Sequence, residues 1–198
     1  RLTPEASAAA DAVAASKAEP PTPENPTDVA AANFHYTGAA FVKGGLKAKF
    51  RANLDAIRTL KAIQIEGRTA ATPAEQEIMS KYIGWGQFPA LFNDWSDTDW
   101  TDERKLLRSL ITAEEWRDAQ ASISNAHYTD PSIVDAQWKI ADHLGYKGGT
   151  FLETSAGIGY YLGMMPEALR AKTHATAVEK DALTGAMLKM LYPADNFE

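Results

Sequence analysis

Apolar residues recur every three or four positions in several stretches of this chain, which is the spacing of one face of an α-helix. The stretch 46–66 shows this pattern clearly. The apolar positions of the helix predicted there are Leu46, Phe50, Leu54, Ile57 and Leu60. We therefore expect an amphipathic helix that buries one face against the rest of the protein.

The next helix is predicted from its capping residues. Thr72 and Glu75 have the spacing of a capping box, and Pro73 suits the first helical position. The pattern predicts a helix that continues to Gly84, with inward side chains at Ile78, Met79, Tyr82 and Ile83. Trp85 follows between two glycines. This turn can pack in the core or present a ring for stacking on a base, and we favour the core because aromatic side chains mostly serve cores.

The segment 93–122 is acidic and carries helix-capping signals at Thr101 and at Thr112 with Glu115. It predicts short helices without catalytic chemistry. Their expected anchors in the core are Trp95, Trp100 and Trp116.

A further helix is predicted after residue 130. Thr129 or Asp130 can cap it, and Pro131 opens it. Its expected buried face consists of Val134, Trp138, Ala141 and Leu144.

From residue 150 onward, short strands alternate with helices. Strands are predicted at 150–153 and 174–181, and the helix between them has Ile158, Leu162 and Met165 on one face. A last helix from 182 has the apolar positions Leu183, Met187 and Leu191. This order predicts one right-handed βαβ unit, which is the start of a parallel sheet. The fold class is therefore α/β, with a helical N-terminal region followed by an incomplete Rossmann-like sheet.

Composition separates the first 32 residues from the rest. The segment 1–32 is rich in Ala, Pro, Glu and Thr and contains no aromatic residue. Its stretch "EPPTPENP" cannot continue a helix, so we interpret 17–32 as a linker and 5–16 as an Ala-rich helix with little to bury. The chain begins with Arg rather than Met, and we interpret it as a piece of a longer polypeptide.

Composition also excludes several classes of site. The chain has no cysteine, which excludes disulfides and cysteine-based zinc sites, and its four histidines are scattered, so we predict no metal site. No apolar run approaches the roughly 18 residues of a membrane span, so we predict no membrane partner. The net charge of -6 argues weakly against bulk nucleic-acid binding, although local charge matters more than the sum.

The clearest candidate chemistry follows the first predicted strand. Gly157 and Gly159 let the backbone approach a ligand closely, and Glu179 lies 20 residues after Gly159, at the distance of an acid that binds ribose hydroxyls. A dinucleotide fingerprint needs a third glycine at position 162, but Leu162 stands there and Gly163 comes one place late. A phosphate-binding loop with Gly-Lys-Ser/Thr is also absent from the sequence. An adenosine ligand without phosphates, S-adenosylmethionine (SAM), suits these residues better.

The helix predicted at 46–66 also has a basic stripe, formed by Lys47, Arg51, Arg58 and Lys61. One interpretation is a face that contacts DNA phosphates. The other is the solvated face of a helix that packs in the core, which is common for amphipathic helices.

Several motifs together resemble one family. "NAHYTDPSIV", "FLETSAGIG" and "AVEKDALTGAMLKMLYP" resemble the amino-methylating (N6-adenine) DNA methyltransferases. With "KGGLKAKFRANLDAIRTLKAI" and "ATPAEQEIMSKYIGWG" upstream, the chain is most similar to large phage and plasmid proteins that join such a methylase to a helicase, among them phage antirestriction proteins. The likeness spans about residues 33–198.

The resemblance implies a SAM site in which Glu179 holds the ribose. The matching positions are Tyr128, Thr129, Pro131, Glu153, Ser155, Ala156, Gly157, Gly159 and Glu179. The sequence departs from the family at Thr154, where Pro is usual, and at Gln87, where a third glycine is typical. Composition predicts a disordered linker or tail at 1–32, and the resemblance implies a helical region at 33–124 and a partial SAM-binding methyltransferase domain at 125–198.

The catalytic motif of this family, Asn/Asp-Pro-Pro-aromatic, does not occur in the sequence. The resemblance therefore implies part of a SAM-dependent adenine-N6 DNA methyltransferase, for modification or antirestriction, and the chain by itself is expected to be inactive. The implied partners are DNA and the remaining polypeptide, or another chain, along the open sheet edges. The expected location is the cytoplasm of a bacterial host.

Two alternatives remain open from the sequence. The chain can be a non-catalytic component packaged in a phage virion, among virion proteins. It can also be a DNA- or protein-binding module built on a methyltransferase-like fold, for which Thr154 is the only support.

Overall fold

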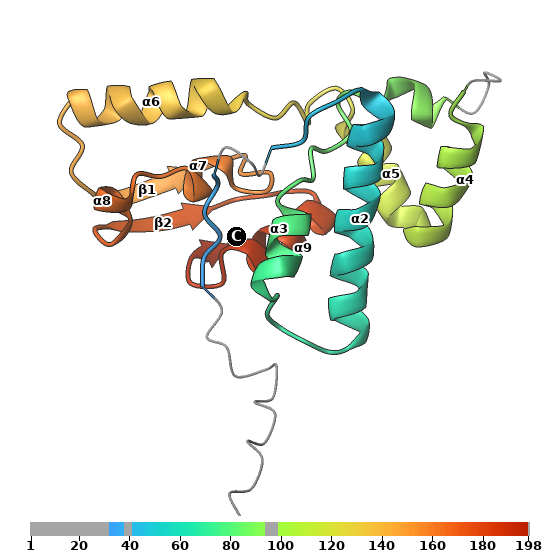
Figure 1. The fold of residues 1–198 in the computed structure, drawn as a ribbon, viewed down its shortest axis with the longest axis horizontal. Coiled ribbons are helices and arrows are strands. Elements are labelled where there is room, and N and C mark those ends of the chain that lie inside the picture. Colours follow the sequence, from blue (N-terminus) through green and yellow to red (C-terminus); the bar gives the residue numbers. More distant parts are fainter. Residues whose placement is uncertain (1–31, 38–40, 94–98, 198) are drawn as a thin grey trace, which may run out of the picture. The chain divides into compact units, whose positions relative to one another are not determined.

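The computed structural model describes residues 32–37, 41–93 and 99–197, and it shows a mixed α/β fold (Figure 1). Residues 31–198 belong to one compact unit. The tail predicted at 1–32 lies outside the described residues, apart from Ala32. The elements in chain order are α2 (Leu46–Ile65), α3 (Pro73–Met79), the 3-10 helix η2 (Pro89–Phe92), α4 (Thr101–Leu110), α5 (Ala113–Ser122), α6 (Pro131–His143), β1 (Gly149–Glu153), α7 (Tyr160–Gly163), α8 (Glu167–Arg170), β2 (Thr173–Ala177), α9 (Ala182–Leu191) and β3 (Asn196–Phe197).

The sheet is small and parallel, with the strand order β1-β2-β3. β1 and β2 are in register from Gly149 opposite Thr173 to Glu153 opposite Ala177. β3, which the sequence pattern did not predict, pairs with β2 at its carboxyl end. The second strand is shorter than the predicted 174–181, because the chain turns away after Ala177 towards α9.

Helix α2 buries the predicted stripe against α3 and α9 (Figure 1). Phe50, Leu54, Ile57 and Leu60 are buried, as predicted. Leu46 is the exception, with 44% of its surface exposed, because it lies in the first turn of the helix at the edge of the core.

Helix α3 begins as predicted but ends earlier. The Thr72–Glu75 capping box is formed and Pro73 is the first helical residue. The helix ends at Met79 rather than continuing to Gly84, because the N–H groups of Lys81 and Tyr82 donate to carbonyls only three residues back. The next N–H, that of Ile83, donates to the side chain of Asn53. Of the expected inward side chains, Met79 and Tyr82 are buried, Ile83 is partly buried and Ile78 is exposed.

The capping predictions for the later helices are partly confirmed. Thr112 and Glu115 form the second capping box, at the start of α5. Thr101 is the first residue of α4 rather than its cap, and Trp100 occupies the cap position. Asp130, not Thr129, caps α6 by accepting from the backbone N–H of Ser132.

Helix α6 packs over β1 through one large side chain. The indole Nε1 of Trp138 donates to the carbonyl of Tyr161 (3.1 Å), and its ring lies 5.3 Å from that of Phe151 on β1. Val134 is buried on the same face, as predicted. Leu144 is 79% exposed, contrary to the prediction, because α6 ends at His143 and the chain leaves the core there.

The short segment 32–37 runs across the C-terminal part of the domain. The N–H of Phe34 donates to the carbonyl of Leu191 (2.7 Å), and the N–H of Tyr36 donates to the carbonyl of Gly163 (3.0 Å). The buried side chain of Gln76 on α3 donates to carbonyls of both this segment and α9. These bonds join the helical region and the sheet region into one unit.

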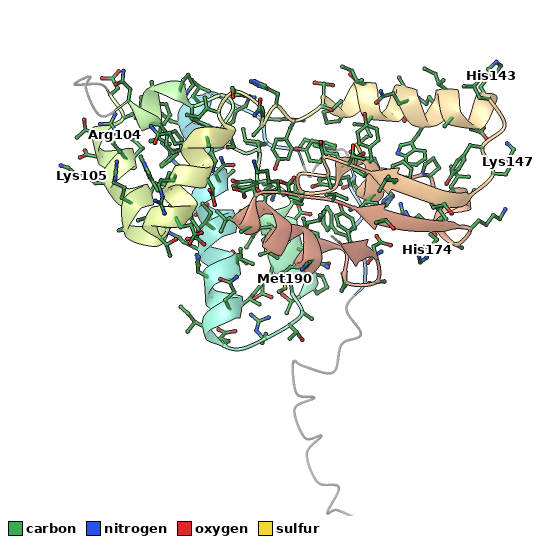
Figure 2. The ribbon with its side chains drawn as sticks, turned by 180° about the vertical axis from the view of Figure 1, so that it is seen from behind. Arg104, Lys105, His143, Lys147, His174 and Met190 are labelled. Atoms are coloured by element: carbon green, nitrogen blue, oxygen red, sulfur yellow. The ribbon has the colours of Figure 1, made fainter. Side chains whose placement is uncertain are left out.

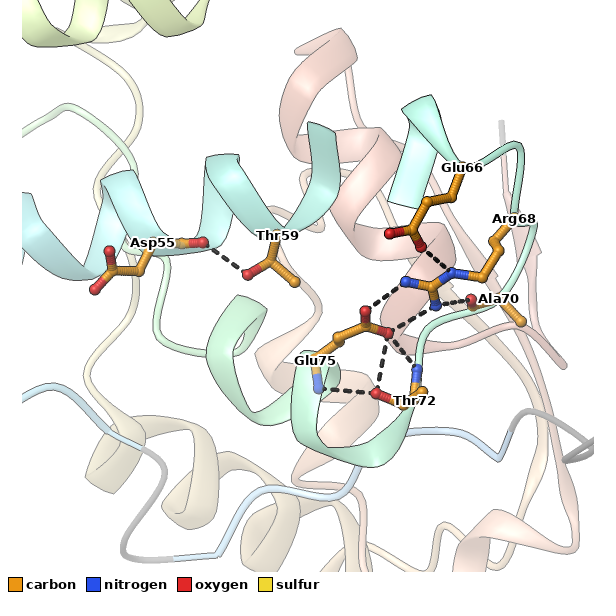
Figure 3. Close-up of polar contacts among 7 residues, drawn as sticks. All are labelled: Asp55, Thr59, Glu66, Arg68, Ala70, Thr72 and Glu75. Carbon is orange, nitrogen blue, oxygen red and sulfur yellow. Dashed lines mark hydrogen bonds and ion pairs between the residues drawn. The ribbon is translucent and has the colours of Figure 1, made fainter. Parts of the chain in front are cut away.

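A charged clip closes the loop between α2 and α3 (Figure 3). Arg68 donates to both carboxylate oxygens of Glu75, at 2.9 Å and 2.5 Å, and to Glu66 at 2.7 Å. The hydrogen bonds from Arg68, with further bonds from Thr72, lower the pKa of Glu75 to about 2. Glu75 therefore serves both the ion pair and the capping box.

We expect Glu75→Gln to lower the free energy of unfolding by about 2 kcal/mol at neutral pH. The folded-state pKa is depressed, so the carboxylate stabilises the fold above its ordinary pKa of 4.5. This contribution is lost as the pH falls towards 2. Urea titrations across this range should therefore show the difference between wild type and variant shrinking. The matched control is Glu77→Gln, which removes an exposed pair with Lys81 and should cost no more than about 0.5 kcal/mol. Equal losses for both variants would contradict the role of the clip.

Within the described ranges, none of the helices has the length and apolar character that a bilayer span requires. The same residues contain no cluster of three His, Asp or Glu side chains that could hold a metal ion. In Figure 2, His143 at the end of α6 and His174 on β2 come from different elements and are exposed.

Candidate functional site

A pocket of about 800 Å³ opens at the carboxyl ends of β1 and β2. Its floor and walls come from both halves of the domain. The sheet half contributes Glu153, Thr154, Ser155, Ala156, Gly157, Tyr160, Tyr161, Val178, Glu179, Lys180, Asp181 and Thr184. The helical half and the loop before α6 contribute Tyr82, Gly84, Trp85, Asp118, Ala121, Ser122, Asn125, Ala126, His127, Tyr128 and Thr129.

The loop after β1 is tied to the end of β2 by backbone hydrogen bonds. The N–H of Val178 donates to the carbonyl of Glu153 (2.8 Å), and the N–H of Ala156 donates to the carbonyl of Val178 (3.0 Å). Gly157 then adopts the left-handed conformation, with φ of 56°. The loop is thereby held across the ends of both strands, with its backbone facing the pocket.

Glu179 is the acidic centre of the pocket. One of its carboxylate oxygens accepts from the N–H of Gly157 and the other from the N–H of Asp181, each at 2.8 Å. Asp181 in turn caps α9 by accepting from the N–H of Thr184 (2.7 Å). Because a carboxylate has about four acceptor sites, Glu179 keeps capacity for two more donors.

Tyrosine rings form the other side of the pocket. Tyr128 makes edge contacts with Tyr160 (centroids 5.5 Å apart) and with Tyr82 (6.4 Å). Burial raises the pKa of Tyr128 well above its ordinary value and that of Tyr160 to about 12. Both hydroxyls stay protonated at physiological pH, so they can make hydrogen bonds but do not act as bases. The rings add aromatic surface to the pocket.

The structure brings most of the predicted cofactor residues into this one pocket. Those that line it are Tyr128, Thr129, Glu153, Ser155, Ala156, Gly157 and Glu179. Two others are not among the lining residues. Pro131 is the first residue of α6, and Gly159 precedes α7 in a left-handed conformation against the ring of Tyr192. Of the two departures from the family pattern, Thr154 lies on the lining, whereas Gln87 accepts a hydrogen bond from Lys49.

The basic stripe of α2 is largely occupied by contacts within the protein. Lys47 pairs with Glu103 on α4 (2.7 Å) and lies 4.2 Å from the ring centroid of Trp100. Lys61 pairs with Glu115 on α5, and Arg58 with Asp55 on its own helix. Arg51 is exposed. These contacts favour the interpretation as a packed helix with a solvated face, and DNA contact by this stripe stays a prediction.

The sequence interpretation missed the contribution of the helical half to the pocket. Asp118, Ser122 and Asn125, on and just after α5, line it, although 93–122 was expected to carry no chemistry. Trp85 is only 2% exposed, which confirms core packing, yet its edge also reaches the pocket. The Gly-Trp-Gly triplet at 84–86 was the one local signal for this contribution.

The pocket combines features that suit a nucleoside-type ligand without phosphates. It has aromatic faces, a glycine-containing loop, and the carboxylate of Glu179 with free acceptor capacity beside those of Asp118, Glu153 and Asp181. Its volume lies in the range of small-molecule sites. Comparison of the chain with models of known protein families, with curated proteins and with solved structures found no match.

Proposed function

We propose that this chain forms the SAM-binding part of an adenine-N6 DNA methyltransferase. The observation that carries the proposal is the convergence of the 153–157 loop, Glu179 and Tyr128 on one pocket at the carboxyl ends of two parallel strands. In open α/β sheets, ligands bind at this end of the strands. The order β1-β2-β3 also agrees with one half of a doubly wound sheet.

The residues fit an adenosine-type cofactor. The ribose of such a ligand has two vicinal hydroxyls, and Glu179 can accept from both while keeping its bonds to the backbone. The absence of a side chain at Gly157 lets the Tyr128 ring lie against the loop, whose N–H at Gly157 holds Glu179 in place. Tyr128 and Tyr160 provide aromatic surface for its apolar parts.

When bound, SAM would supply an electrophilic methyl group for the exocyclic amine of adenine. The transfer would form a C–N bond, break the S–CH3 bond of the sulfonium to leave the neutral thioether, and release one proton from the amine. The target amine is hidden in duplex DNA, so the base must be extruded from the stack. The residues described here bind and orient the cofactor.

The test is calorimetric titration of the folded protein with SAM. We expect saturable binding, and we expect Glu179→Gln to weaken it about ten- to hundred-fold, because hydrogen bonds to a charged group contribute about 1.5–3 kcal/mol. The control is Glu167→Gln, an exposed carboxylate on α8 outside the pocket lining, which should bind like wild type.

Two results would contradict the proposal. One is a folded wild-type protein that does not bind SAM at millimolar concentration. The other is a Glu179→Gln variant with unchanged affinity. The first result would favour the alternative of a non-catalytic binding module.

A further inference from the structure

We infer that the turn Gly84–Trp85–Gly86 is a positioning element of the cofactor pocket, which holds the Tyr128 ring against the glycine loop. This inference rests on the proposed function and extends it to the helical half of the chain. It assigns a role to a turn that is distant in sequence from both the loop and Glu179.

The two glycines of this turn let the segment 126–128 pack directly against the backbone of the turn, because neither has a Cβ. A Cβ at Gly84 would lie 2.7 Å from Cε2 of Tyr128, and a Cβ at Gly86 would lie 2.3 Å from the carbonyl oxygen of Ala126. Real Cβ atoms do not approach this closely, so alanine at either position must displace the segment or the turn.

The opposite edge of the same ring faces the glycine loop. A Cβ at Gly157 would lie 3.0 Å from Cε1 of Tyr128 and 3.3 Å from its hydroxyl oxygen. The ring is therefore wedged between Gly84 on its Cε2 edge and Gly157 on its Cε1 edge. A methyl group at position 84 pushes the ring towards Gly157, whose N–H binds Glu179 (2.8 Å).

The turn itself is anchored, so it cannot yield easily. The fully buried side chain of Asn53 on α2 donates to the carbonyl of Gly84 (2.7 Å) and accepts from the N–H of Ile83 (2.9 Å). Trp85 is buried against Phe88 and Phe92. A clash at position 84 is therefore transmitted to Tyr128 rather than absorbed by the turn.

The experiment compares the SAM affinity of Gly84→Ala with that of Gly67→Ala. Both glycines have φ of 67°, but a Cβ at Gly67 meets nothing within 4 Å, so this control carries the same backbone strain without the contact. We expect Gly84→Ala to bind SAM at least about tenfold more weakly than Gly67→Ala, since overpacking costs about 1–3 kcal/mol. Equal affinities would overturn the inference. If Gly84→Ala does not fold, Gly86→Ala replaces it in the test. Its Cβ would also clash with the segment 126–128, but Gly86 does not have a positive φ, so alanine adds no backbone strain there.

A double-mutant cycle separates positioning from general damage to the fold. Tyr128→Ala removes the ring through which Gly84 acts, so adding Gly84→Ala to it should change SAM affinity less than twofold. If Gly84→Ala weakens binding equally in both backgrounds, its role is only structural and the inference is wrong.

A readout without ligand keeps this inference distinct from the proposed function. If the wild-type protein does not bind SAM, the proposed function is wrong. Hydrogen exchange of the 156–158 amides can still test whether the turn at 84–86 holds the Tyr128 ring against this loop. We expect faster exchange there in Gly84→Ala than in Gly67→Ala. Unchanged exchange would overturn the inference irrespective of the ligand.

Discussion

Gly157→Leu is expected to abolish SAM binding, with a loss of at least about a hundredfold in affinity. Gly157 lines the pocket, and a side chain there meets the Tyr128 ring from its first carbon, at 3.0 Å. The residue also has φ of 56°, so leucine strains the loop and disturbs the N–H that binds Glu179. Calorimetric titration with SAM measures the effect, and circular dichroism confirms that the variant is folded.

The control for this variant is Gly145→Leu. Gly145 also has positive φ, at 90°, but it lies after α6, and a Cβ there meets nothing within 4 Å. We expect this variant to bind SAM like wild type. If binding survives Gly157→Leu, the assignment of the site to this loop is wrong.

Gly159→Ala is expected to lower the free energy of unfolding by about 3 kcal/mol or more, the largest stability effect predicted here. Gly159 has φ of 81°, and a Cβ would lie 2.4 Å from Cε2 of Tyr192 and 2.9 Å from Cδ1 of Leu188. Tyr192 is buried, and its hydroxyl donates to the carbonyl of Gly159 (2.8 Å), so the ring cannot move without losing this bond. Urea denaturation followed by tryptophan fluorescence measures the loss.

The matched control for stability is Gly185→Ala. This glycine lies inside α9, and its Cβ would have no neighbour nearer than 3.8 Å. Alanine should stabilise the helix there by about 0.5–1 kcal/mol. A Gly159→Ala variant as stable as wild type would show that the ring of Tyr192 can be displaced without cost, contrary to the packing described.

Local sequence patterns were sufficient to predict those features that depend on residues close together in the chain. The capping boxes at Thr72 and Thr112 formed as predicted, because their interactions span three residues. The stripe of α2 is buried as predicted apart from Leu46, because helical periodicity alone places its residues on one face. The residues of the glycine loop and Glu179 could likewise be selected from spacing, since a strand, a glycine turn and a helix are consecutive in the chain.

Contacts distant in sequence decided the rest. Asn53 accepts from the N–H of Ile83, 30 residues away, just beyond the end of α3. Gln76 joins α3 to α9 across 114 residues. Glu103 on α4 and Glu115 on α5 pair with Lys47 and Lys61 of the basic stripe, across more than 50 residues of sequence. None of these pairings can be predicted from the periodicity of the sequence. Polar side chains pair with whichever group the tertiary packing places next to them, and that group can lie anywhere in the chain.

The sequence by itself determined the order of the elements, the glycine loop and its acid, because backbone preference and hydrophobic period are properties of short segments. Only the tertiary structure decided that the helical half forms a wall of the same pocket. The physical reason is the ring of Tyr128, which fits between Gly84 and Gly157 because neither residue has a Cβ. Such a fit depends on two backbones meeting at contact distance, and it exists only after the halves have packed together.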